Sequence, residues 1–227
     1  MKTRIESVRE RIRTAALDAG RQPESVRLVA VSKTMPAEMV RRAAEAGLTV
    51  MGENYIQESR EKVEALADLD LTWHFIGHLQ SNKAKYAVRL FDLIHSVDSI
   101  KLARELDRQA AKHDKVQDIL IQVNTGKEAS KSGVYAEEAL ALVREAGQLD
   151  HLAIKGLMTL PPYFNAPEKV RPYFRQLREL RARIASEALP GVSMAELSMG
   201  MTGDFEAAIQ EGATLVRIGT AIFGERQ

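Results

Sequence analysis

The chain has 227 residues, 45% of them hydrophobic, which is enough to bury one substantial core. Its 32 basic and 31 acidic residues leave a net charge of +1, so no overall field attracts nucleic acid or an anionic membrane. Cysteine is absent, which excludes disulfides, thiolate zinc sites and cysteine nucleophiles. Residues 1–20 are too charged for a signal peptide, and no apolar run approaches the roughly 18 residues of a membrane span. We therefore expect a cytoplasmic protein.

Short β-rich segments alternate with helix-like segments along the whole chain. A helix is predicted first, over about residues 3–19. Strands are then predicted at residues 27–32, 48–52, 72–77, 91–97, 118–124, 152–158, 195–199 and 214–219. The stretches between them carry apolar residues at helical spacing, for example in residues 37–47, 99–114, 136–147 and 168–188.

Eight alternating strand and helix units favour a parallel (β/α)8 TIM barrel with an extra N-terminal helix. No proline-rich or Gly/Ser-rich linker interrupts the series, so we expect a single domain over residues 1–227. An open doubly wound sheet is the competing interpretation. Such a sheet normally has fewer strands, and its glycine fingerprint for nucleotides is absent after the first strand, where the chain reads SKTMP.

Polar residues gather where the predicted strands end. Lys33 follows the first strand, Asn54 the second and His78 the third. In a barrel these carboxyl ends form one rim, which is where active sites lie. Any one of these side chains, taken alone, is better explained as a strand cap or a satisfied polar group of the core.

The last two units carry a more specific signal. Loops after strands seven and eight hold a phosphate in many barrels, because small residues let the backbone approach it. Here SMGMTGD supplies the hydroxyls of Ser198 and Thr202, and IGTAIFG supplies Gly219 and the hydroxyl of Thr220. Either loop alone has an even chance of being an ordinary glycine turn, but both occur at the expected places.

Arg217 and Lys33 are predicted to point into the barrel. Alternation along the last strand places Arg217 on the face opposite Val216 and Ile218, which should pack against the helices. A buried guanidinium needs a partner, either a buried carboxylate or a ligand. The same alternation turns Lys33 inward, where desolvation and a nearby cation would lower the pKa of its amine from about 10.4 and make it a nucleophile.

The segments VAVSKT, GENY, IGHLQSNK, GLMT, SMGMTGD and VRIGTAIFG resemble the YggS/PROSC family of pyridoxal-phosphate-binding proteins, which are relatives of the amino-terminal barrel of alanine racemase. The resemblance runs in order from about residue 26 to residue 224. It implies a barrel that holds pyridoxal 5′-phosphate (PLP) as an internal aldimine on Lys33. It also implies a phosphate contact for Ser198, Gly219 and Thr220, a position near the pyridine nitrogen for Arg217, and a position beside the ring for Asn54.

The function implied is PLP homeostasis, meaning binding, buffering or delivery of the cofactor to PLP-dependent client enzymes. An arginine at the pyridine nitrogen can only donate a hydrogen bond, so it weakens the ring as an electron sink. The sequence reaches Gln227 soon after the last predicted strand, so we expect no second, racemase-type domain, a monomer and little or no amino-acid turnover. The alternative is a PLP-dependent, racemase-like enzyme.

Other interpretations are less well supported. His74 and His78 are four residues apart in a predicted strand, where roughly 13 Å separates them, so they cannot share one metal ion. Lys155 is the rival for covalent chemistry and would suit a Schiff-base aldolase, but it lies early in its strand and away from the rim. A protein that only binds other proteins would form no covalent adduct with the cofactor.

Overall fold

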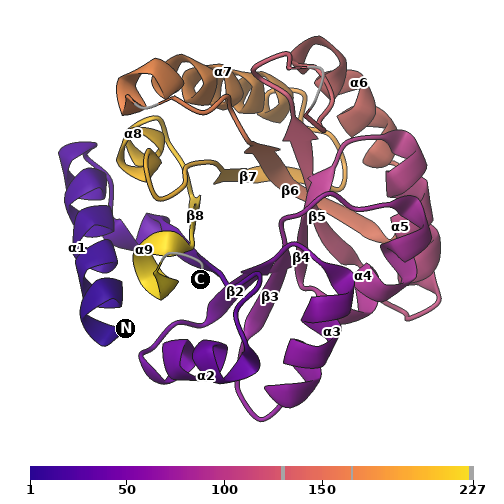
Figure 1. The fold of residues 1–227 in the computed structure, drawn as a ribbon. Helices are drawn as coiled ribbons and strands as arrows, with labels where there is room; N and C mark the ends of the chain where they lie inside the picture. Colours follow the sequence, from indigo (N-terminus) through magenta and orange to yellow (C-terminus); the bar gives the residue numbers. More distant parts are fainter. Residues whose placement is uncertain (129–130, 165, 225–227) are drawn as a thin grey trace.

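The computed structural model describes residues 1–128, 131–164 and 166–224. Within them, eight strands form a closed, entirely parallel barrel in chain order, in which β1 also pairs with β8 (Figure 1). The strands are β1 (Arg27–Val31), β2 (Val50–Glu53), β3 (Thr72–Phe75), β4 (Leu93–Val97), β5 (Gln117–Val123), β6 (Leu152–Thr159), β7 (Val192–Ser198) and β8 (Leu215–Ile218). The predicted barrel is confirmed, and the open doubly wound sheet is excluded.

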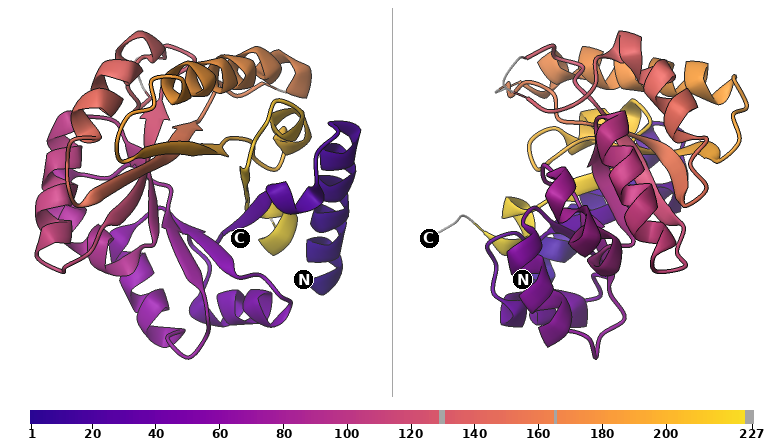
Figure 2. Two further views of the ribbon diagram at one scale, coloured as in Figure 1. Left: turned by 180° about the vertical axis from the view of Figure 1, so that it is seen from behind. Right: turned by 90° about the vertical axis from the view of Figure 1, so that its right-hand side faces the viewer.

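Helices surround the barrel on its outside (Figures 1 and 2). They are α1 (Lys2–Asp18), α2 (Ala37–Glu45), α3 (Ile56–Ala65), α4 (Ala84–Leu90), α5 (Ile100–Ala111), α6 (Ala136–Ala146), α7 (Pro167–Ala185), α8 (Phe205–Gln210) and α9 (Thr220–Phe223), with short 3-10 turns at Pro23–Ser25 and Ser81–Lys83. The predicted N-terminal helix is confirmed. It packs against α8 and α9 and so covers the side of the barrel where the last strand meets the first.

The apolar residues divide into two cores because side chains alternate along each strand. The larger core lies between the strands and the helices and includes Ala30, Val216 and Ile218. The smaller core fills the barrel itself, and its buried members come from five strands: Val29, Leu93, Leu120, Met158 and Leu215. This division confirms the predicted alternation in β8, because Leu215 faces inward whereas Val216 and Ile218 face the helices.

None of the helices in the described part of the chain is both long enough and apolar enough to cross a membrane. The strand end that differs most from its predicted position is the start of β7, which begins at Val192 rather than near residue 195, and the start of β4 at Leu93 lies two residues later than predicted. Neither difference moves a residue of the predicted site.

Candidate functional site

One cavity of about 340 Å³ lies where the strands end. Its walls come from the segments that follow β1, β2, β3, β6, β7 and β8. Six of the seven predicted cofactor contacts line it: Lys33, Asn54, Thr202, Arg217, Gly219 and Thr220. The structure therefore brings together at one rim residues that span almost the whole sequence.

The loop after β7 is held against β8 by backbone hydrogen bonds. The amide of Met199 donates to the carbonyl of Leu215 over 3.1 Å, and the amide of Arg217 donates to the carbonyl of Gly200 over 3.0 Å. Gly200 has a φ of 93°, and a Cβ there would lie only 2.6 Å from the side chain of Ala208, so this position needs glycine. The tight passage brings Thr202 beside Thr220, whose hydroxyls are 3.2 Å apart.

Arg217 reaches the cavity wall from inside the barrel, as predicted, and only 3% of its surface is exposed. Its guanidinium donates to the Ser198 hydroxyl over 2.5 Å and to the Thr159 carbonyl over 2.8 Å. Both acceptors are neutral, and within residues 1–128, 131–164 and 166–224 no carboxylate forms an ion pair with it. Burial lowers the pKa of Arg217 to about 10, so the group still carries its charge at neutral pH.

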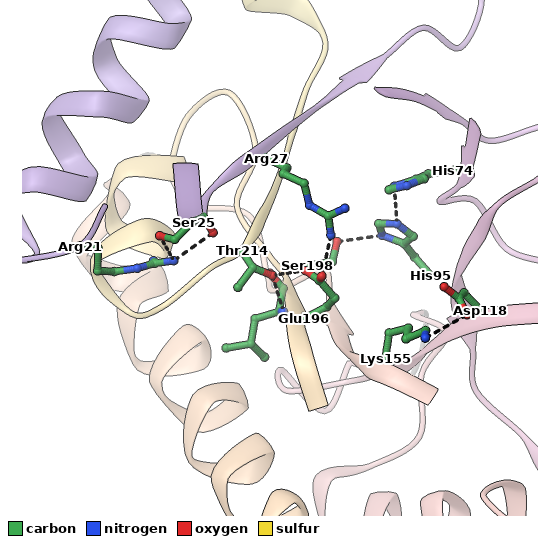
Figure 3. Close-up of polar contacts among 11 residues, drawn as sticks. Arg21, Ser25, Arg27, His74, His95, Asp118, Lys155, Glu196, Ser198 and Thr214 are labelled. Carbon is green, nitrogen blue, oxygen red and sulfur yellow. Dashed lines mark hydrogen bonds and ion pairs between the residues drawn. The ribbon is translucent and has the colours of Figure 1, made fainter. Parts of the chain in front are cut away.

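Ser198 lies behind Arg217 and is fully buried, rather than on the cavity wall. Its hydroxyl is 2.9 Å from Nδ1 of His95, and Nε2 of His95 is 3.0 Å from Nδ1 of His74 (Figure 3). Its predicted role at a phosphate stays a prediction, and the structure gives its hydroxyl these other partners.

The direction of this hydrogen-bonded chain follows from Arg217, which can only donate. Ser198 accepts from Arg217, and Nδ1 of His95 is the other partner of its hydroxyl among the described residues, so we direct the serine proton to that nitrogen. His95 must then donate from Nε2 to Nδ1 of His74, and both rings are neutral. Burial lowers the pKa of His74 to about 3 and holds that of His95 well below its usual value. This series of hydrogen bonds holds Arg217 in place without placing a second charge beside it.

Sequence reasoning missed several residues of the site. His95 comes from the apolar strand β4, and only its polarity among buried neighbours signals a special role. Tyr163 and Phe164 line the mouth of the cavity from the segment after β6, where no periodic pattern marks them. Asp204 lines the cavity too, and burial raises the pKa of its carboxyl group, whose Oδ1 accepts a hydrogen bond from the Met201 amide.

The residues behind the competing predictions lie elsewhere. Lys155 is 3.3 Å from the carboxylate of Asp118 at the start of β5, and it does not line the cavity (Figure 3). His74 contacts His95, whereas Nδ1 of His78 contacts the hydroxyl of Ser132 over 3.1 Å. In the part of the chain that the structure describes, no three His, Cys, Asp or Glu side chains group as a metal site would require.

Comparison with known proteins connects this cavity to a family. The model of the alanine racemase N-terminal domain matches residues 4–227. The pyridoxal phosphate homeostasis protein of Aquifex aeolicus is 50% identical over 224 residues, covering 99% of this chain and 97% of that protein. The protein of the same name from Pseudomonas aeruginosa is 46% identical over 222 residues, covering 98% and 94%.

A solved structure is similar along its whole length. PipY of Synechococcus elongatus, in its structure with PLP bound, is 39% identical, with a TM-score of 0.86, and the match covers 98% of this chain and 99% of PipY. These similarities confirm the resemblance that the sequence motifs indicate. The chain belongs to the pyridoxal phosphate homeostasis protein family, within the larger family of alanine racemase N-terminal domains.

Proposed function

We propose that this protein captures PLP at Lys33, buffers it and delivers it to PLP-dependent client enzymes, as a monomer with little or no amino-acid turnover of its own. The observation that carries the proposal is that Lys33, in the turn after β1, and Arg217, in the neighbouring strand β8, line one cavity with two loops of glycine and threonine. The relative PipY, at 39% identity, has a structure with PLP bound.

The residues present fit the chemistry of this cofactor. When bound, PLP supplies an aldehyde, which condenses with a neutral lysine amine and releases one water. Thr202 and Thr220 offer adjacent hydroxyls for a phosphate, and Gly203 and Gly219 leave the backbone accessible. A Cβ at Gly203 would meet no atom within 4 Å, so the loop is open on that side.

Two polar groups of the cavity fit an aromatic ring with a nitrogen acceptor. Arg217 presents a charged donor to the cavity and has only neutral acceptors behind it. Asn54 faces the same space, and its buried Oδ1 has no hydrogen-bond partner among the described residues. Such an unsatisfied oxygen is costly unless a ligand or a water contacts it.

The charged arginine also supports the limit on turnover. At the pyridine nitrogen of bound PLP it would donate a hydrogen bond and keep that nitrogen unprotonated, which would make the ring a weaker acceptor of electrons from a bound amino acid. The protein then binds the cofactor without the full catalytic power of a PLP enzyme, which suits storage and delivery.

The test is to incubate the protein with PLP, reduce it with borohydride and locate the modified lysine by peptide mass spectrometry. We expect one stoichiometric adduct on Lys33, none in the Lys33→Ala variant and an unchanged yield in the matched Lys155→Ala variant. An adduct on Lys155, or scattered adducts on surface lysines, would contradict the assignment. Robust racemisation of amino acids by the loaded protein would instead support the racemase-like alternative, and sedimentation of a dimer would contradict the monomer.

A further inference from the structure

A second lysine is buried directly behind the turn that carries Lys33. Lys62, on α3, has a side chain that is only 5% exposed. Its ammonium group donates to the Ser32 carbonyl over 2.5 Å, to Glu53 over 2.8 Å and to Glu58 over 2.5 Å. An ammonium group has three protons, and these contacts use all three. Lys62 is therefore committed to the protein and is not available as a nucleophile.

The same cluster holds the backbone on both sides of Lys33. Before it, Ser32 donates its hydroxyl to Glu53 over 2.6 Å and accepts from Lys62 at its carbonyl. After it, the Thr34 amide donates to Oε1 of Glu58 over 2.5 Å. Lys33 thus lies in a turn whose two flanking residues are each fixed by a charged side chain.

The backbone of this turn has an unusual conformation. Thr34 has a φ of 65°, in the left-handed region that a β-branched residue rarely adopts. Such a conformation persists only where the surroundings hold it, and it is most common at functional sites. The charge-assisted bond to Glu58 is the contact that holds the Thr34 amide in place.

We propose that Glu58 and Lys62 are positioning residues, which fix the Ser32–Thr34 turn so that the Lys33 amine meets its carbonyl substrate in a productive orientation. This inference rests on the proposed function, because it needs Lys33 to be the residue that captures PLP. A nucleophile that is held in a productive orientation reacts faster, because it does not spend time in orientations that cannot react. The role is distinct from folding, because Glu58 lies at the edge of the cluster, with 27% of its side chain exposed.

The test compares Glu58→Ala, Glu58→Gln and Glu64→Ala. One oxygen of Glu58, Oε1, accepts from both Lys62 and Thr34, so the oxygen of a glutamine side chain can keep both bonds. Glu64 is an exposed glutamate on the same helix and serves as the matched control. Two quantities are measured: hydrogen exchange of the Thr34 amide in the protein without cofactor, and the rate of covalent labelling of Lys33 by PLP. Thermal unfolding checks that each variant is folded.

We expect Glu58→Ala to speed exchange of the Thr34 amide and to slow labelling of Lys33, each by about tenfold, the equivalent of one lost charge-assisted hydrogen bond. Glu58→Gln should recover most of both effects, and Glu64→Ala should match the wild type. Wild-type labelling rates in a folded Glu58→Ala protein, with Lys33 still the labelled residue, would overturn this inference alone. A wild-type protein that forms no adduct on Lys33 would overturn the proposed function as well.

Discussion

Replacing Lys62 with methionine should destabilise the protein by about 3–5 kcal/mol, the usual cost of removing one partner from a buried ion pair. Glu53 is fully buried, and Oε1 of its carboxylate receives hydrogen bonds from Lys62 and Ser32. Its other oxygen, Oε2, has no partner among the residues that the structure describes. Without Lys62, a buried negative charge would keep only the serine hydroxyl. Methionine has nearly the same length, so a cavity adds little to the loss.

The loss of stability in the Lys62→Met variant should depend on pH, and the ionisation of Glu53 determines the direction of that dependence. Burial raises the pKa of Glu53 above 4.5, and its hydrogen bond and ion pair with Lys62 partly oppose that rise. Removing Lys62 therefore raises the folded-state pKa further. Between the unfolded and folded pKa values the folded protein binds more protons, so stability falls as pH rises. The penalty of the variant should be smallest below the folded-state pKa of Glu53 in the wild type, which lies above 4.5, and should grow until the pH passes the higher folded-state pKa of Glu53 in the variant.

The assay is urea unfolding of the wild type and of Lys62→Met at a series of pH values. The double variant Lys62→Met with Glu53→Gln should recover stability at neutral pH, because the buried charge is then gone. It should also lose the added dependence on pH. A Lys62→Met protein whose destabilisation stays below about 1 kcal/mol at neutral pH, or is the same at every pH, would refute the reasoning that Glu53 depends on this lysine for its charge.

Three further predictions follow from contacts in the barrel. A Cβ at Gly77 would overlap the backbone of Asn54, so Gly77→Ala should weaken PLP binding as well as stability. A Cβ at Gly156 would overlap the β7 backbone away from the cavity, so Gly156→Ala should lower stability alone. Fluorescence titration measures the binding of PLP, and urea unfolding measures stability. Ser198→Ala should cost about 1–3 kcal/mol in urea unfolding, because a buried guanidinium loses an acceptor. Burial lowers the pKa of His74 from 6.5 to about 3 in the folded protein. Between these two pH values the unfolded protein binds more protons, so stability is lost as pH falls. In that range His74→Phe should reduce the slope of unfolding free energy against pH by about 1.4 kcal/mol per unit.

The positions of Lys33 and Arg217 could be predicted from the sequence because they follow from local rules. Alternation along a strand decides which side chains face the barrel, and the end of a strand decides which rim a residue occupies. Both rules apply within a single element. They hold for β8, where Leu215 faces the barrel interior and Arg217 reaches the cavity, while Val216 packs outside.

The side chains that hold Lys33 and Arg217 in place could not be predicted in the same way. The sequence SMGMTGD indicates a phosphate contact for Ser198, which stays a prediction, but it does not reveal the contacts of its hydroxyl with Arg217 and His95. The cluster of Lys62 joins three elements, and only its helical spacing of four residues to Glu58 is visible in the sequence. The hydrogen-bond partner of a buried polar side chain depends on contacts between different helices and strands, and the sequence pattern of one helix or strand does not reveal that partner.

Lys62 and Arg217 are both buried but have different surroundings, and the difference matches the different roles proposed for them. Lys62 contacts two carboxylates and a carbonyl, so its charge is compensated within the protein. Arg217 is held by a serine hydroxyl and a carbonyl, and its neighbours His95 and His74 are kept neutral by burial. A cation that is oriented but not neutralised at a cavity wall favours a ligand that brings an acceptor or a negative charge. On the proposed function, the carboxylates Glu53 and Glu58 help to fix the turn that carries Lys33, whereas the charge of Arg217 stays available to the ligand.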